Sequence, residues 1–187
     1  LFFNYLLFAL VFIGGFLAVY GNSIIEEGKQ KGYSWQKGLE GENLVSNYLN
    51  TLPKDYFVFN DVNLPGKGGN IDHVVIGPTG IYVIETKNYS GRYRIKGNQW
   101  LYYKNGQYME IKKNPGTQVR RNTLNLIDFL NQRDISTKKT WITSLVAFNC
   151  PDFKGLQTPQ KYKDLHPKTV PEYILNGKKE KYMNLLG

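Results

Sequence analysis

The sequence predicts an α/β domain with a mixed central sheet, on three observations. Two apolar runs, Ile71–Ile76 and Ile81–Ile84, flank a Gly-Pro-Thr-Gly turn, the pattern of a β-hairpin. Apolar side chains recur at helical spacing over residues 34–52 and again over residues 114–132. Residues 141–149 are rich in β-formers without clean alternation, which indicates a buried strand. The predicted order is helix, three strands, an exposed hairpin, helix and strand.

The boundaries of these elements follow from local signals. Ser34 is a possible cap for the first helix, and Pro53 stops it. Residues 56–64 read as the first strand, ahead of the opening hairpin. Residues 92–111 suggest two or three exposed strands, turning at Asn105-Gly106. Asn114 followed by Pro115 marks the start of the second helix.

Composition bounds the possible partners. The chain has 187 residues, which is enough for one domain with a core and a terminal appendage. Its 24 Lys and Arg outnumber 15 Asp and Glu, for a formal charge of +9. Such an excess favours nucleic acid or an anionic membrane surface as a partner. Cys150 is the only cysteine, which excludes an internal disulfide and a cysteine-rich zinc site.

The first twenty residues contain no charge, and they are long enough to cross a bilayer as a helix. We therefore expect a transmembrane helix at 1–21, a linker at 22–33, a folded domain at 34–150 and a C-terminal extension at 151–187 that packs on the domain. A cleaved signal peptide is the rival interpretation, although a clear small-x-small cleavage site is missing. Lysines shortly after the segment favour a cytoplasmic position for the domain on a single-pass cell-membrane anchor.

The charges inside the hairpin are the feature that points to chemistry. Residues that face each other across the predicted turn have numbers that sum to 157, which puts Asp72 opposite Glu85. Because side chains alternate, one face is expected to carry Asp72, Val74, Ile76, Ile81, Val83, Glu85 and Lys87, and the other Ile71, His73, Val75, Tyr82, Ile84 and Thr86. Facing carboxylates repel, so Lys87 or a divalent cation such as Mg²⁺ must offset them. A salt-bridge network without a metal is the alternative.

An ordered set of motifs resembles one known family. The segments are "GLEGENLVSNYL", "FNDVNLP", "GNIDHVVIGPTGIYVIETKNYSGR", the Trp100 region and "NPGTQVRRN", together covering roughly Lys37 to Phe148. With them the chain resembles NERD (nuclease-related domain) proteins, within the PD-(D/E)xK or restriction-endonuclease-like superfamily. The resemblance implies an αβββαβ core and Mg²⁺- or Mn²⁺-dependent hydrolysis of nucleic acid. Ile71, in place of the superfamily's leading proline, departs from the pattern.

The resemblance also implies roles for individual residues. Asp72 and Glu85 correspond to metal-binding carboxylates, and Thr86 would lend its backbone carbonyl to the metal. Lys87 resembles the lysine that orients or deprotonates the attacking water. Glu42 resembles a first-helix glutamate that completes the acidic cluster, and Gln118 resembles a glutamine beside the metal. As alternatives, Glu42 is a solvated surface residue and Gln118 an ordinary polar helix residue.

Basic and aromatic residues extend this expectation to the substrate. Lys112, Lys113, Arg120 and Arg121 cluster around the start of the second helix and are candidates to grip phosphates, with a solvated basic face as the alternative. Candidates to stack on bases are Tyr89, Tyr93, Trp100, Tyr102 and Tyr103, although aromatic residues are also common in strands without a ligand. Three functions are expected to compete: a membrane-anchored nuclease of DNA, an inactive nucleic-acid-binding module, and an anchored interaction domain.

Overall fold

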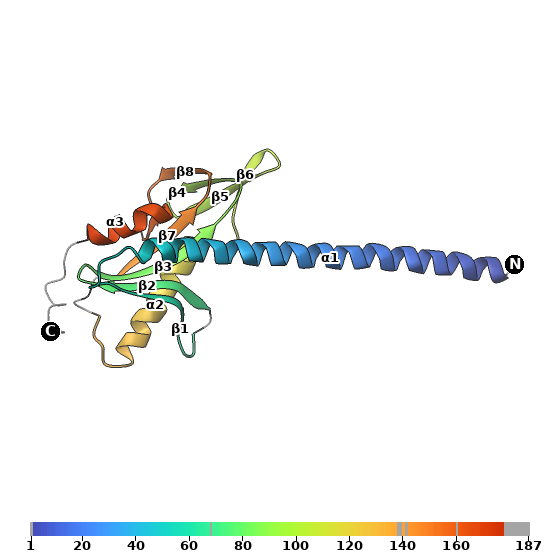
Figure 1. Cartoon of the computed structure of the whole chain (residues 1–187). Helices are drawn as coiled ribbons and strands as arrows, with labels where there is room; N and C mark the ends of the chain where they lie inside the picture. The colour runs from blue at the N-terminus through green and yellow to red at the C-terminus, as the bar shows by residue number, and fades with distance from the viewer. Residues whose placement is uncertain (1, 68, 138–139, 141, 160, 178–187) are drawn as a thin grey trace. The chain divides into compact units, whose positions relative to one another are not determined.

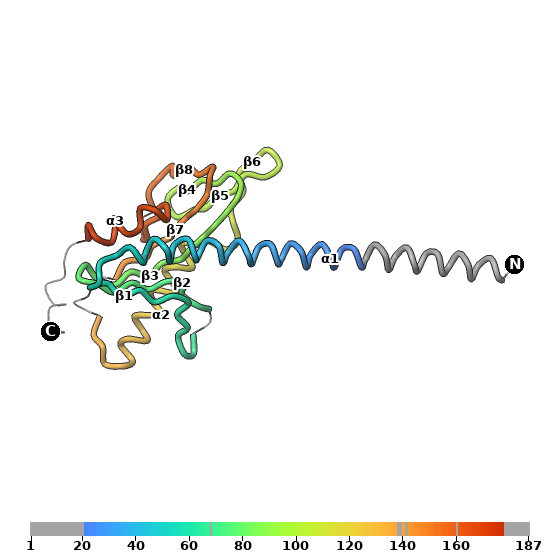
Figure 2. The backbone as a smooth tube through the Cα atoms, in the orientation of Figure 1, coloured from blue at the N-terminus to red at the C-terminus, as the bar shows by residue number. Residues whose placement is uncertain are grey.

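The computed structural model describes residues 2–67, 69–137, 140, 142–159 and 161–177, with helical backbone alone for 2–20. The chain separates into two compact units, Leu1–Lys37 and Gly38–Gly187. Figures 1 and 2 show the course of the chain, with its helices, strands and backbone. The second unit contains every strand of the described chain and carries the candidate site.

Helix α1 runs from Phe2 to Leu49 and passes from the first unit into the second. The predicted start at Ser34 is therefore wrong, and the predicted linker at 22–33 is helical. No proline interrupts this stretch. Ion pairs between residues three apart, such as Glu26 Oε1 with Lys29 Nζ at 2.9 Å, stabilise the helix.

A span across a membrane was expected at 1–21. Except for Gly21, that segment lies outside the residues whose side chains the structure describes. Within the described residues, no helix is both long enough and apolar enough to cross a membrane.

Five strands form the central sheet of the second unit, in the order β1-β2-β3-β7-β9. Their bounds are Phe57–Asn63 for β1, Asn70–Gly77 for β2, Gly80–Asn88 for β3, Ile142–Asn149 for β7 and Lys163–Leu165 for β9. Strands β1, β2 and β3 are antiparallel, whereas β7 runs parallel to β3 and β9 parallel to β7. The mixed sheet is confirmed, and so is the hairpin register, because Ile76 pairs with Ile81 and His73 with Ile84.

Helices cover both faces of this sheet. Val45 and Leu49 of α1 pack with Val75, Ile84 and Leu145, in a cluster that also includes Val170 and Ile174 from α3 (Val170–Leu175). On the opposite face, α2 (Pro115–Asn131) contributes Val119 and Leu126 to a cluster with Val74, Val83 and Val146. The two apolar faces explain why β3 and β7 have near-continuous apolar sequences.

A second sheet has four strands in the order β6-β5-β4-β8. The strands are β4 (Arg92–Lys96), β5 (Gln99–Lys104), β6 (Gln107–Glu110) and β8 (Asp152–Gln157). Asn105 and Gly106 both have positive φ, 50° and 83°, as the predicted turn requires. The expectation of exposed strands is wrong for one face, since Ile95 and Trp100 are fully buried. Trp100 packs edge-on against Phe148 with ring centroids 4.8 Å apart, which the sequence of one strand does not reveal.

The chain after Asn149 contributes to both sheets. Strand β8 pairs in parallel with β4, and β9 pairs with β7. A short 3₁₀ helix, η1 (Pro167–Thr169), then leads into α3. Tyr162, in the same segment, accepts a 2.6 Å hydrogen bond from Nε1 of Trp100.

His73, on β2, forms hydrogen bonds with side chains of both neighbouring strands. Its Nδ1 lies 2.8 Å from Oδ1 of Asn60, and its Nε2 lies 3.0 Å from Oγ1 of Thr86. An amide oxygen can only accept, so Nδ1 donates to Asn60. In the neutral imidazole, Nε2 then accepts from the hydroxyl of Thr86. Burial lowers the pKa of His73 from 6.5 to about 4. His73 is thus a packing and hydrogen-bonding residue, as its predicted position away from Asp72 indicated.

This network predicts a pH-dependent part of the stability. The pKa of His73 is lower in the folded chain, so the unfolded chain binds a proton first as the pH falls. The stabilisation that the neutral His73 contributes to the folded chain is complete above about pH 6.5 and is lost as the pH falls toward 4. In urea unfolding, the free-energy advantage of the wild type over His73→Gln should shrink by about 2 kcal/mol between pH 7 and pH 5. A constant difference would show that His73 is not held neutral.

Candidate active site

The site begins where β2 separates from β3. The ladder between the two strands ends at the pair His73–Ile84, while β2 stays paired with β1 as far as Asn70. At this fork the backbone N–H of Thr86 donates a 2.7 Å hydrogen bond to Oδ2 of Asp72. The carboxylate of Asp72 therefore accepts from Thr86 in place of a main-chain carbonyl of β2. Alternation is also broken here, because Ile71 packs on the same side as Val74, contrary to the predicted assignment of faces.

Glu85 is the most deeply buried acid of the site. It is 1% exposed and forms an ion pair with Lys87, whose side chain is 20% exposed. Nδ2 of Asn122, on α2, lies 3.4 Å from the second carboxylate oxygen of Glu85 and 3.3 Å from the carbonyl oxygen of Asn70. Both oxygens of Glu85 are thus contacted by polar groups from two different elements.

The pKa of each acid is raised, and burial is the largest cause for both. Burial, followed by the charge of Asp72, raises the pKa of Glu85 to about 7, although Lys87 acts in the opposite direction. Burial likewise raises the pKa of Asp72, against the lowering effects of the Thr86 N–H and the Lys87 charge. A divalent cation would relieve this penalty, since it favours the charged form of both groups.

Lys87 supplies the positive charge of the site. Burial alone would lower its pKa, but the charge and hydrogen bond of Glu85, together with the charge of Asp72, raise the pKa above its usual value. The side chain is therefore an ammonium group at neutral pH. In this arrangement it acts as a fixed positive charge and not as a base.

Glu42 reaches the site through a close approach of α1 to the sheet. A Cβ atom on the preceding Gly41 would lie 2.6 Å from Cβ of Asn88, so only glycine allows this packing. Glu42 is half-buried, and burial followed by the charge of Asp72 raises its pKa. Among the described residues, no three His, Cys, Asp or Glu side chains converge closely enough to hold a metal ion together. Glu42 thus interacts with the acidic pair electrostatically.

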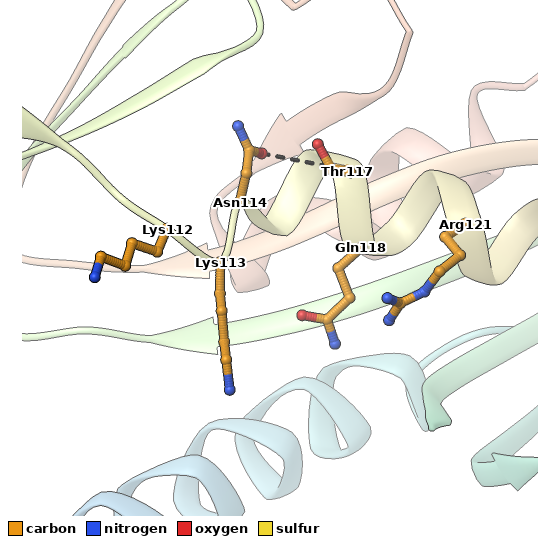
Figure 3. Close-up of a pocket in the computed structure, with 6 residues that line it drawn as sticks. All are labelled: Lys112, Lys113, Asn114, Thr117, Gln118 and Arg121. Atoms are coloured by element: carbon orange, nitrogen blue, oxygen red, sulfur yellow. Dashed lines mark hydrogen bonds between the residues drawn. The ribbon is translucent and has the colours of Figure 1, made fainter. Parts of the chain in front are cut away.

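The predicted phosphate-binding residues are only partly brought together. Lys112, Lys113, Gln118 and Arg121 line one groove of about 470 Å³ beside the start of α2 (Figure 3). Lys113, Gln118 and Arg121 extend to the same side in this view, while Lys112 points away from them. Arg120 is half-buried and does not line this groove. Asn114 caps the helix by accepting hydrogen bonds from the N–H groups of Gly116 and Thr117.

The aromatic residues expected to stack on bases are mostly structural. Trp100 is buried, and Tyr89 and Tyr93 stack on each other 4.9 Å apart against the core. Tyr102 is half-buried, whereas Tyr103 is exposed. The sheet thus uses most of these rings for packing, which was the alternative interpretation.

Two residues of the site were missed in the sequence. Asn122 stands one helical turn after Gln118, so its position on the sheet-facing side of α2 was a usable signal. Gly41 precedes Glu42 in a helix where glycine is unfavourable, and such a glycine often marks a close approach. The role of Asn60 behind His73 depends on strand pairing and had no local signal.

Part of this sequence is shared with known proteins. Residues 37–149 match the family described as the nuclease-related domain. The chain belongs to the nuclease-related domain (NERD) family. It is also 38% identical, over 101 residues, to an uncharacterized protein from Bacillus anthracis. That alignment covers 52% of this chain and 41% of the relative, so the chain spans less than half of the relative's length. No solved structure matches the chain.

For this NERD domain, the buried acids predict an unusual response to neutralisation. Asp72→Asn keeps an oxygen that can accept from the N–H of Thr86 and removes the repulsion with Glu85 and Glu42. Since folding raises the pKa of Asp72, its ionisation costs stability as the pH rises. In EDTA near pH 8, the substitution should increase the free energy of unfolding by about 1 kcal/mol.

Urea denaturation measures this change, and Asp55→Asn is the matched control. Asp55 is exposed, so its neutralisation should alter stability by less than about 0.5 kcal/mol. A loss of stability in Asp72→Asn would mean that the carboxylate is held by favourable charge pairing and carries no net penalty.

Proposed function

We propose that this NERD protein is a metal-dependent nuclease that hydrolyses phosphodiester bonds of nucleic acid, with DNA as the substrate. One observation carries the proposal: a buried acid, Glu85, and a half-buried acid, Asp72, stand at the fork of two central strands beside the ammonium group of Lys87. Burying ionisable groups costs free energy, and metal-assisted hydrolysis is a chemistry that needs two carboxylates and a lysine close together.

The residues at the fork fit a hard divalent cation. Asp72 and Glu85 provide carboxylate oxygens, and the backbone carbonyl of Thr86 is the proposed third ligand; Mg²⁺ prefers such oxygen donors, completed by water, and Mn²⁺ accepts them. The raised pKa of each acid fits as well: burial disfavours both carboxylates, and a bound cation would favour their charged forms. When bound, the metal would polarise a phosphoryl oxygen and lower the pKa of a water molecule.

The chain's own side chains supply the rest of the chemistry. Lys87 places positive charge where the phosphate gains negative charge in the transition state. Asn122 holds Glu85 in position, and Glu42 adds negative charge that favours a cation. Gln118 stands one turn before Asn122 on α2, in the groove, where its amide can orient the substrate.

The groove beside α2 is the proposed path for the phosphate backbone. Lys112, Lys113 and Arg121 bring positive charge to the N-terminal end of a helix, where anions are favoured. Arg120 lies outside the groove, so we propose that it attracts the phosphate backbone only by long-range electrostatics.

Anchoring at the cell membrane is part of the proposal. Residues 1–20 are uncharged, and the lysines that follow favour a cytoplasmic nuclease domain. After alkaline extraction of cell membranes, the full chain should remain in the pellet. Recovery of a shortened, freely soluble form would instead indicate a cleaved signal peptide.

The role of Lys87 separates an enzyme from a binding module. If Lys87 acts mainly in the transition state, Lys87→Ala should reduce the single-turnover cleavage rate by about 10²-fold or more. Its affinity for nucleic acid should hardly change, because one phosphate contact among many contributes little. The measurement is single-turnover cleavage of DNA in Mg²⁺ or Mn²⁺ beside equilibrium binding in EDTA, with RNA as a second substrate.

Two neighbouring arginines provide the contrasting case. Arg121→Ala should weaken binding and reduce its salt dependence, with the cleavage rate intact at saturating substrate. Arg120→Ala removes the same charge outside the groove and should have a smaller effect. A wild type that binds nucleic acid but cleaves none with any metal would replace the proposal with that of an inactive binding module.

A further inference from the structure

The four-stranded sheet has a second, solvent-facing surface that the proposed catalytic site does not use. One face packs on the core through Ile95 and Trp100. Among the residues that the strand register places on the other face are Arg92, Arg94, Tyr103, Tyr108 and Lys154. We call these five residues the outer face. Tyr103 pairs directly with Tyr108, and Arg94 lies beside Lys154.

Guanidinium groups and rings are already stacked on the outer face. The guanidinium carbon of Arg92 lies 4.9 Å from the ring centroid of Tyr103, and that of Arg94 lies 4.3 Å from the centroid of Tyr108. The two rings are 5.2 Å apart at 60°. Tyrosine rings and guanidinium planes are the surfaces on which unpaired bases stack. The outer face therefore presents two adjacent pairs of a guanidinium group and a tyrosine ring.

The charges around these rings suit a phosphate backbone. Arg92 is ion-paired with Asp152 at 2.7 Å, but both side chains are about half exposed, at 51% and 58%. An exposed pair of this kind contributes little stability, so a phosphate can replace the carboxylate. Arg94 and Lys154 add two further positive charges, and Glu110, on β6, adds a negative charge to the same face.

The hydroxyl group of Tyr108 has a hydrogen-bonding capacity that its described neighbours leave unsatisfied. Its oxygen is buried and has no hydrogen-bond partner among the residues that the structure describes. Buried polar groups without partners are uncommon in folded proteins and cost free energy. Because this oxygen is buried, a ligand can bond to it only if side chains of the outer face move on binding.

We propose that the outer face binds single-stranded nucleic acid. Bases stack on Tyr103 and on the guanidinium planes, while Arg92, Arg94 and Lys154 contact phosphates. A single strand is favoured over a duplex because stacking requires bases that are not already paired. The inference takes only the class of ligand from the proposed function and places its binding on a different surface.

Fluorescence anisotropy of the full chain with labelled oligothymidylate of about 20 nucleotides tests this inference. EDTA is present throughout, so that cleavage does not interfere. Tyr103→Ala should weaken binding about ten-fold or more, on the scale of one lost base stack, and Tyr103→Trp should restore it. Arg94→Ala should weaken binding and reduce the salt slope by about 0.7.

Matched controls come from elsewhere in the chain. Arg133 also stacks on a ring, 3.6 Å from the centroid of Phe129, and Tyr33 is 65% exposed on α1. Arg133→Ala and Tyr33→Ala should leave the affinity within about two-fold of the wild type. Each variant must unfold at the wild-type temperature. Because Tyr103 is 41% exposed, its truncation should not disturb the core.

Three results would overturn the inference: no binding of the oligonucleotide by the wild type, unchanged affinity in both Tyr103→Ala and Arg94→Ala, or loss of self-association in these variants without loss of oligonucleotide affinity. Its failure is distinguishable from failure of the catalytic proposal. A chain that cleaves DNA but binds oligothymidylate independently of Tyr103 retains the active site without this surface. A chain that cleaves nothing but needs Tyr103 for binding retains the surface alone.

Discussion

The repulsion between the buried carboxylate of Glu85 and the half-buried carboxylate of Asp72 is the constraint on which the rest of the site depends. Glu85 is buried and Asp72 half-buried, and burial followed by the charge of Asp72 raises the pKa of Glu85 to about 7. The protein offsets this with the ammonium of Lys87 and with the N–H of Thr86. Thr86 and Lys87 follow Glu85 on β3, while Asp72 lies on β2, so most of the site comes from one strand. A bound cation would supply the remainder.

The two helices that pack on the sheet also complete the site. Helix α2 buries Val119 and Leu126 against the sheet and, from the same side, directs Asn122 to Glu85. Helix α1 approaches β3 closely at Gly41, which brings Glu42 within the field of Asp72. The polar groups therefore stand where the apolar packing ends, and their positions follow from that packing. Substitutions that shift either helix should disturb the site without touching the acids.

The predictable parts were those governed by local rules. The turn before Ile81 set the hairpin register, and Asn114-Pro115 set the start of α2, because both depend on neighbouring residues. The fork at Asp72 could not be predicted, since a side chain there replaces a main-chain partner. The burial of Trp100 was missed for a related reason: its partners, Phe148 and Tyr162, come from distant parts of the chain. Local sequence patterns thus predicted the helices and strands, whereas the contacts that form the site depend on long-range packing.

Calorimetric titration of the full chain with Mn²⁺ is the most direct test of the central claim, that Asp72 and Glu85 form a cation site. The wild type should bind Mn²⁺, and Asp72→Asn and Glu85→Gln should each abolish binding while both variants remain folded. Binding should also strengthen as the pH rises through about 7, where Glu85 loses its proton. Unchanged Mn²⁺ affinity in both variants would contradict the account, and the acidic pair would then be a metal-free salt-bridge network with Lys87.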